Sequence, residues 1–280
     1  MRSIWKGAIS FGMVTIPVKL YSATEQKDVR FRLLHKTDHA PIVEKRFCTE
    51  DGKEVAWDDL VRGFEVAKGE YVVLDPDEIE EAKPESASTI EIGDFVELTE
   101  IDPIYFEKTY FLEPTDVGAK PFSLLKRALE ETERVAVARV VIRTKERLAT
   151  IRAYDGTLAL ETMYWPDEIR STGGLDLPEG AETKVRAKEL EMARSLVENL
   201  SDRFDPESYK DQYRIALEQL IEDKMRGERR NVKRRKPDAK VIDLMEALSA
   251  SVEQSRKQGA KGAKRPAKAG KARRRRASAA

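Results

Sequence analysis

The sequence is poor in the side chains on which metal and acid–base chemistry most often depends. Its 280 residues include one cysteine, Cys48, and two histidines, His35 and His39. A single cysteine excludes a disulfide within the chain and is typical of a reducing compartment. A closed zinc site needs four ligands, so these three would require a carboxylate such as Asp38 or Glu50 as the fourth. We expect ordinary turn and strand residues here rather than a metal site, and no cofactor.

Long apolar runs are also absent. No stretch approaches the roughly 18 apolar residues that a membrane-spanning helix requires. Residues 1–20 alternate with a period of two, unlike the apolar core of a signal peptide. The glycine loops that bind nucleotide phosphates and the Gly-x-Ser-x-Gly elbow are missing as well. We therefore expect a soluble, cytoplasmic protein without a membrane partner.

The chain has no net charge, because 51 Lys and Arg balance 51 Asp and Glu, but the two signs are unevenly distributed along it. Residues 224–280 hold 20 bases and 5 acids, a net charge of +15. The remaining 223 residues hold 31 bases and 46 acids, a net charge of −15. The sequence thus predicts an acidic body with a basic tail.

The first 180 residues are mostly typical of β-strands. Apolar and polar residues alternate in 14–20 and again in 29–35, where Arg30 and Arg32 share one face. Asp155-Gly156 is a strong two-residue hairpin signal and predicts a three-stranded meander near 135–165. Short helices are expected after Asp75 and over 120–133. Many short strands with few helices predict a mainly β fold with some α, built on a β-barrel core. Further strands are expected at 71–75, 88–98, 105–114, 135–143, 148–154 and 157–165.

Helical spacing replaces strand alternation after a Gly- and Pro-rich loop at 171–180. One helix is expected within 182–204 and a second from Asp205 to about Gly227. A basic linker and a short amphipathic helix follow, and the Lys/Arg-rich end is too polar to fold. The predicted domains are a barrel core at 1–180, a helical arm at 181–227, a linker and partner-binding helix at 228–253, and a disordered basic tail at 254–280.

Two enzymatic interpretations are weaker than a binding function. A metal-dependent nuclease would use carboxylates and a lysine on adjacent strands, and Pro166-Asp167 with Glu182-Thr183-Lys184 matches that pattern only loosely. The second stretch opens a helix rather than lying on a strand, so a capped turn and a charged first helical turn explain the two stretches better. A nucleotidyl transferase would need Lys-x-Asp-Gly, whereas the chain has Lys36-Thr37-Asp38-His39. We expect no enzyme activity, with a DNA end-processing nuclease as the alternative.

The basic segments predict contact with a nucleic acid. Two blocks lie on either side of the short amphipathic helix, on a body that is itself acidic. Phosphate backbones are the commonest target of such segments, and neutralising them gives a sequence-independent, salt-sensitive affinity. Solubility alone is the simpler alternative, and a protein that coats chromosomal DNA through its tail alone is another. The blocks include Lys233, Arg234, Arg235, Lys236, Arg273, Arg274, Arg275 and Arg276.

Several stretches in order along the chain resemble the prokaryotic Ku proteins. They begin with RSIWKGAISFGMVTIPVKLYSAT and continue through HKTDHAPIVEKRFCTEDGKEV, GEYVVLDPDEIEEAKPESASTIEIGDFV, IDPIYFEKTYFLEP and PESYKDQYRIALEQLIEDKM. The resemblance covers about the first 225 residues. VIDLMEALSASV is similar to the family's short C-terminal segment. The family pattern has a second cysteine soon after the position of Cys48, which this chain lacks, so the resemblance does not predict a zinc knuckle.

The resemblance implies a Ku core: a β-barrel with a bridge that encircles DNA, and a helical arm. It also implies a homodimeric ring on double-stranded DNA ends, acting in non-homologous end joining and recruiting the ATP-dependent DNA ligase D. Such a protein would be cytoplasmic and associated with the nucleoid. A ring needs to grip phosphates but not to read bases.

Specific contacts can then be expected. The densest basic neighbourhood of the body is expected to line the ring, and an ordinary solvated strand face is the alternative. This neighbourhood comprises Arg30, Arg32, Lys36, Lys45 and Arg46.

The apolar stripe of the second helix fits either an intrachain core or a dimer seam, and the family resemblance favours the seam. This stripe comprises Tyr209, Tyr213, Leu217 and Leu220. The short C-terminal stripe is expected to dock on the ligase, with tethering to the chain's own core as the alternative; it comprises Val241, Leu244, Met245 and Leu248.

Overall fold

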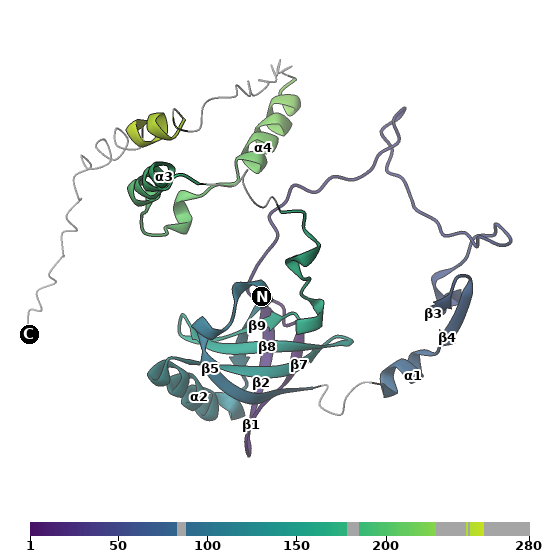
Figure 1. Ribbon diagram of the computed structural model, residues 1–280. Coiled ribbons are helices and arrows are strands. Elements are labelled where there is room, and N and C mark those ends of the chain that lie inside the picture. Colours follow the sequence, from purple (N-terminus) through teal and green to yellow (C-terminus); the bar gives the residue numbers. More distant parts are fainter. Residues whose placement is uncertain (83–87, 178–184, 228–244, 246, 255–280) are drawn as a thin grey trace, which may run out of the picture. The chain divides into compact units, whose positions relative to one another are not determined.

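The computed structural model of the protein describes residues 1–82, 88–177, 185–227, 245 and 247–254. The chain divides into two compact units, Met1–Gly173 and Gly174–Ala280. The first unit is mainly β, and the second contains helices (Figure 1).

Seven strands of the first unit close a barrel in the order β1-β2-β6-β9-β8-β7-β5. Neighbours are antiparallel except β1 and β5, which run parallel. The predicted β-barrel is therefore confirmed. The strands are β1 (Trp5–Phe11), β2 (Val14–Ser22), β5 (Thr89–Glu97), β6 (Phe106–Pro114), β7 (Arg134–Ile142), β8 (Lys145–Tyr154) and β9 (Thr157–Met163).

Strand alternation fills the barrel with aliphatic side chains. Ile16, Val18 and Leu20 of β2 are fully buried, as the period-two pattern predicts, whereas Val14 at the start of the same pattern is exposed. Leu158 and Leu160 of β9 meet them in the same core. Burying each side chain of this size stabilises the fold by roughly 1.5–3 kcal/mol, so the barrel interior is the main source of the unit's stability.

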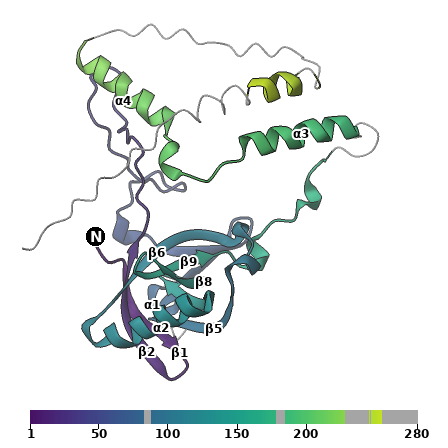
Figure 2. The ribbon, with the colours of Figure 1, turned by 90° about the vertical axis from the view of Figure 1, so that its left-hand side faces the viewer.

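Helix α2 (Ala119–Thr132) closes one end of the barrel. Phe122, Leu125 and Leu129 form its buried stripe and join the barrel core. The helix contacts β2 on one side and β7 and β8 on the other, and these strands are not neighbours in the barrel order. It must therefore cross the opening, and Figure 2 shows it beside the barrel. Sequence periodicity also placed Ala128 on this stripe, but that residue is exposed.

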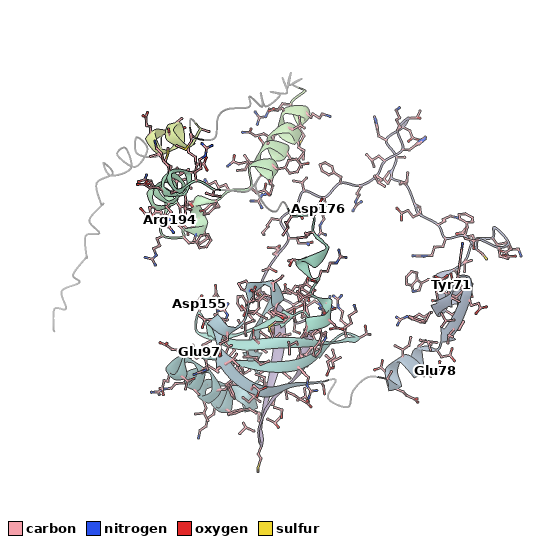
Figure 3. The ribbon with its side chains drawn as sticks, in the orientation of Figure 1. Tyr71, Glu78, Glu97, Asp155, Asp176 and Arg194 are labelled. Carbon is pink, nitrogen blue, oxygen red and sulfur yellow. The ribbon has the colours of Figure 1, made fainter. Side chains whose placement is uncertain are left out.

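The predicted three-stranded meander is confirmed by β7, β8 and β9. Asp155 and Gly156 join the last two strands with φ angles of 40° and 82°. Two successive positive φ angles define the tight hairpin turn whose twist matches that of the strands it joins. Asp155 is labelled at this turn in Figure 3.

The second unit contains α3 (Ala187–Leu200) and α4 (Gln212–Met225). The predicted second helix begins later than expected, because Asp205 caps only a 3-10 turn, Pro206–Ser208. The Asp211 side chain accepts a hydrogen bond from the Arg214 N–H and starts α4. Tyr209 therefore precedes the helix. The predicted C-terminus is confirmed, since Gly227 has a φ of 80° directly after the last turn.

Beyond α4 the structure describes a short helical stretch containing Met245 and residues 247–254. Within the described residues no helix has the length and apolar character needed to cross a membrane. Ten of the predicted binding residues lie outside the described part of the chain: Lys233, Arg234, Arg235, Lys236, Val241, Leu244, Arg273, Arg274, Arg275 and Arg276.

Candidate nucleic-acid interface

The predicted basic neighbourhood lies in a long insertion, residues 23–88, between β2 and β5. It contains two narrow tips, at residues 34–41 and 47–54, and then a hairpin of β3 (Arg62–Ala67) and β4 (Glu70–Leu74). Helix α1 (Pro76–Glu81) follows, with Glu78 accepting from the Asp75 N–H at 2.8 Å, as the capping pattern predicts. Nearly all described side chains of the insertion are exposed, so it has no core of its own.

The expected strand over residues 29–35 does not form. Only Leu34 pairs, through an isolated bridge to Pro41. An extended segment needs a neighbouring strand to satisfy its backbone groups. Residues 40–42 supply this only at the end of the segment, where the Ile42 N–H donates to the Leu33 carbonyl at 3.5 Å and the His35 N–H donates to the Ala40 carbonyl at 2.8 Å. Arg30 and Arg32 are exposed and make no ion pair within the described residues. They therefore lie on a solvated segment rather than on the face of a paired strand.

The first tip is held by its own polar contacts. The His35 Nδ1 lies 2.9 Å from a carboxylate oxygen of Asp38, which also accepts from the Ala40 N–H at 3.0 Å. These two hydrogen bonds, the one from Ala40 first, lower the pKa of the Asp38 carboxyl. His39 adopts a left-handed conformation at the turn. Lys36 is exposed at this tip.

The second tip holds Cys48. Its N–H donates to the Lys53 carbonyl at 2.8 Å, and the Gly52 N–H donates back to the Cys48 carbonyl. The Lys53 ammonium lies 2.9 Å from Asp51 and lowers the pKa of that carboxyl. Within the described residues no three His, Cys, Asp or Glu side chains are grouped as metal ligands would be. His35 and Cys48 instead belong to two separate turns.

Lys45 and Arg46 differ in their surroundings although they are adjacent. The Lys45 ammonium makes an ion pair with Glu54 at 2.8 Å. The Arg46 guanidinium instead lies over the ring of Trp57, 4.3 Å from its centroid. Of the five predicted cations of the insertion, Lys45 alone is in an ion pair within the described chain.

Charge divides the insertion into two halves. Residues 26–46 carry six bases and three acids, whereas residues 47–82 carry three bases and twelve acids. A polyanion would be attracted by the first half and repelled by the second. The positive charge of the insertion is therefore concentrated in its first half, which follows β2.

The hairpin of β3 and β4 exposes apolar side chains on both faces. Phe64 is 65% exposed and Tyr71 is 61% exposed. The Tyr71 ring, labelled in Figure 3, lies across β3 beside Gly63, where an added Cβ would be 3.4 Å from it. An isolated two-stranded hairpin is marginally stable in water. Its apolar surface is therefore available to a partner.

Two lysines of the barrel wall were not predicted from the sequence. Lys6 and Lys19 are directly opposite each other on β1 and β2. Like charges in this position are unfavourable, and only Lys19 has a nearby acid among the described residues, Glu113 at 3.5 Å. An anion beside the pair would relieve the repulsion. The two lysines are brought together by the register of β1 and β2, which could not be predicted from the sequence.

The predicted arm residues have unequal exposure. Tyr209 and Tyr213 are 73% and 76% exposed, while Leu217 and Leu220 are half-buried. The Phe204 ring lies 5.8 Å from that of Tyr209. Met245 and Leu248 of the last helical stretch are also half-buried.

Of the residues of the nuclease alternative, the structure describes Pro166 and Asp167 but not the other three. Asp167 lies in an exposed 3-10 turn, Pro166–Glu168, after the last barrel strand. Glu182, Thr183 and Lys184 lie outside the described residues. Lys36 of the nucleotidyl-transferase pattern lies at the exposed first tip.

A closed barrel that carries a long charged insertion between β2 and β5 defines the class of this protein. The family model described as the Ku70/Ku80 beta-barrel domain matches residues 10–192. The non-homologous end joining protein Ku of Heliobacterium modesticaldum is 48% identical over 92% of this chain and 94% of its own length. The Ku proteins of Anaeromyxobacter sp. (strain K) and Bacillus subtilis are 46% and 43% identical over 92% of this chain, covering 87% and 83% of their own lengths.

The chain belongs to the Ku family, as its sequence pattern predicts. Among solved structures, the SPOC domain of human PHD-finger protein 3 aligns with 58% of this chain and 95% of its own length, at 13% identity and a TM-score of 0.29. A likeness this low has no bearing on the fold.

Proposed function

We propose that this chain binds double-stranded DNA ends in non-homologous end joining, as a scaffold without catalytic activity. The observation that carries the proposal is the basic half of the insertion on a chain of the Ku family, where Arg30, Arg32, Lys36 and Arg46 make no ion pair within the described residues. Exposed cations on an extended segment suit a phosphate backbone, which offers charge without sequence. Arg30, Arg32, Lys36, Lys45 and Arg46 are the proposed contacts, with Lys6 and Lys19 added from the barrel wall. The protein acts in the cytoplasm, associated with the nucleoid.

The proposed active form is a homodimer whose two insertions complete a ring. The exposed apolar hairpin and the segment at 26–32, which pairs with no strand within the described residues, support this. A second copy of the chain would bury the hairpin and pair with the segment. Tyr209, Tyr213, Leu217 and Leu220 extend the proposed seam. Sedimentation equilibrium should give twice the 31.8 kDa mass of one chain. A mass of one chain at micromolar concentration would contradict the ring.

A ring that admits DNA only at a terminus should distinguish linear from closed DNA. In a gel-shift competition over a series of salt concentrations, we expect a linear duplex to compete far better than a covalently closed circle of the same sequence. Equal competition by the circle would contradict the ring and favour a protein that coats DNA through its tail. Cleavage of the linear duplex with Mg²⁺ or Mn²⁺, abolished by Asp167→Ala, would favour the nuclease alternative.

The basic tail is proposed to give a second, looser hold on DNA near the end. A flexible tether raises the effective concentration of its charges without a fixed site. Deleting residues 254–280 should weaken DNA affinity and reduce its salt dependence, yet keep the preference for ends. The measurement is the same competition with the truncated chain. A truncated chain that lost end preference at unchanged affinity would contradict this division of roles.

The helical stretch near Met245 is the proposed docking site for the ATP-dependent DNA ligase D, with Val241, Leu244, Met245 and Leu248 as its contacts. A short amphipathic helix gains most of its stability from the surface that covers its apolar face. Leu248→Glu should abolish co-sedimentation with the ligase while leaving DNA binding unchanged. Retained binding by this variant would exclude the stripe as the contact.

A further inference from the structure

Three basic residues lie between positions 45 and 53 of the insertion, and they differ in how much charge they can offer to DNA. Lys45 is paired with Glu54, and Lys53 is paired with Asp51, at 2.8 and 2.9 Å. Arg46 makes no ion pair within the described chain and instead lies 4.3 Å from the centroid of the Trp57 ring. A carboxylate neutralises the cation it binds, whereas an aromatic face holds a cation and leaves its charge in place.

Backbone hydrogen bonds bring Arg46 and Trp57 together. The Val55 N–H donates to the Arg46 carbonyl at 2.9 Å, which aligns the two sides of the second tip. Trp57 follows two residues later and begins the 3-10 turn Trp57–Asp59. The pair is therefore set by the local chain path and does not depend on how distant parts of the protein are arranged.

Core packing does not explain the position of Trp57. It is 68% exposed, and it borders a surface hollow of about 690 Å³ with Leu60, Val61 and Leu74 among the other lining residues. Because most of the ring is in water, burial in a core does not account for its position, and the Arg46 guanidinium is the contact that the structure shows for its face.

A guanidinium held over a ring is well suited to bind a phosphate. Arginine loses much side-chain freedom when it binds, and holding it beforehand reduces that loss. Its N–H donors lie in the guanidinium plane, so stacking on a ring leaves them free to donate to phosphate oxygens. Lys45 offers neither advantage, because DNA must first displace Glu54 from it.

We propose that Trp57 is a positioning residue that holds Arg46 ready for the DNA phosphate backbone, so that Arg46 is a stronger contact than Lys45. This rests on the proposed function in DNA binding. The role is indirect: Trp57 acts through Arg46 and makes no essential contact with DNA itself.

The test is a double-mutant cycle on affinity for a linear duplex, measured by fluorescence anisotropy over a series of salt concentrations. Arg46→Ala should weaken binding about tenfold, the typical effect of losing a hydrogen bond to a charged group. It should also reduce the slope of log K against log salt by about 0.9 for each copy in the complex. Lys45→Ala and the matched control Lys53→Ala should have smaller effects.

Trp57→Leu should weaken binding about threefold, the size of an exposed cation–π contact, and leave the salt slope unchanged because Arg46 keeps its charge. Trp57→Phe should restore most of the affinity, since it keeps an aromatic face. In the Arg46→Ala background, Trp57→Leu should have no further effect. This last comparison separates positioning from a general loss of structure, which would weaken binding in both backgrounds.

Two results would overturn the inference while leaving the proposed function intact. One is an Arg46→Ala variant that binds like Lys53→Ala, and the other is a Trp57→Leu effect of equal size in both backgrounds. The proposed function fails separately, if the unaltered protein binds closed circles as well as linear duplex or binds neither.

Discussion

Replacing Arg30 and Arg32 together by glutamate is expected to weaken binding to a linear duplex by about a hundredfold or more at low salt. Both arginines are exposed and free of carboxylates within the described chain, so each offers its full charge to a phosphate. In a homodimer the double change affects four positions and converts each attraction into a repulsion. The same anisotropy titration that gives the dissociation constant also gives the salt dependence.

The salt dependence distinguishes direct contact from an indirect effect. Losing four phosphate contacts should reduce the slope of log K against log salt by about 3 to 4. The matched control is Lys120→Glu with Arg127→Glu, which makes the same change in net charge on exposed residues of α2. If both double variants lost affinity equally, the effect would come from total charge and the insertion would not be the interface.

Replacing Glu161 by alanine is expected to destabilise the barrel by about 3 kcal/mol, the lower end of the range for breaking a buried ion pair. Glu161 is 8% exposed on β9 and accepts two hydrogen bonds from Arg152 of β8, at 2.6 and 3.0 Å to the same oxygen. Thr150 lies 3.3 Å from its other oxygen. Removing the carboxylate leaves the Arg152 guanidinium, whose side chain is only 26% exposed, without its acid.

Equilibrium denaturation at matched protein concentration measures this loss, because the stability of a dimer depends on concentration. Glu91→Ala is the matched control, since its ion pair with Arg139 joins β5 and β7 at the surface, with side chains 42% and 58% exposed. That variant should lose less than about 1 kcal/mol. Equal losses in the two variants would show that burial of the Glu161 pair contributes nothing.

The barrel and the site were predictable to different degrees. Alternating apolar residues at 14–20 and the Asp155-Gly156 turn predicted strands that the structure confirms, because period and turn chemistry are local properties. The segment at 29–35 has the same alternation but forms no strand. Alternation predicts which side chains share a face, and only a neighbouring strand can satisfy the backbone.

The contacts of single side chains in the candidate site could not be predicted from local sequence patterns either. Lys45 and Arg46 were predicted as equivalent contacts, and their difference comes from Glu54 and Trp57, which lie on the opposite side of a turn. The lysine pair at positions 6 and 19 is created by the register of β1 and β2. A one-residue shift of that register would turn the side chains to opposite faces.

The order of residues alone determined the family, the strand-rich body and the opposite charges of body and tail, because composition, periodicity and similarity do not depend on the path of the chain. Tertiary structure alone decided that seven strands close on themselves with α2 across one end, and which cations of the insertion remain free of acids. Closure of the barrel depends on contacts between strands far apart in sequence. The state of the cations depends on the turn that brings Glu54 and Trp57 back beside Lys45 and Arg46, and this turn too exists only in the folded chain.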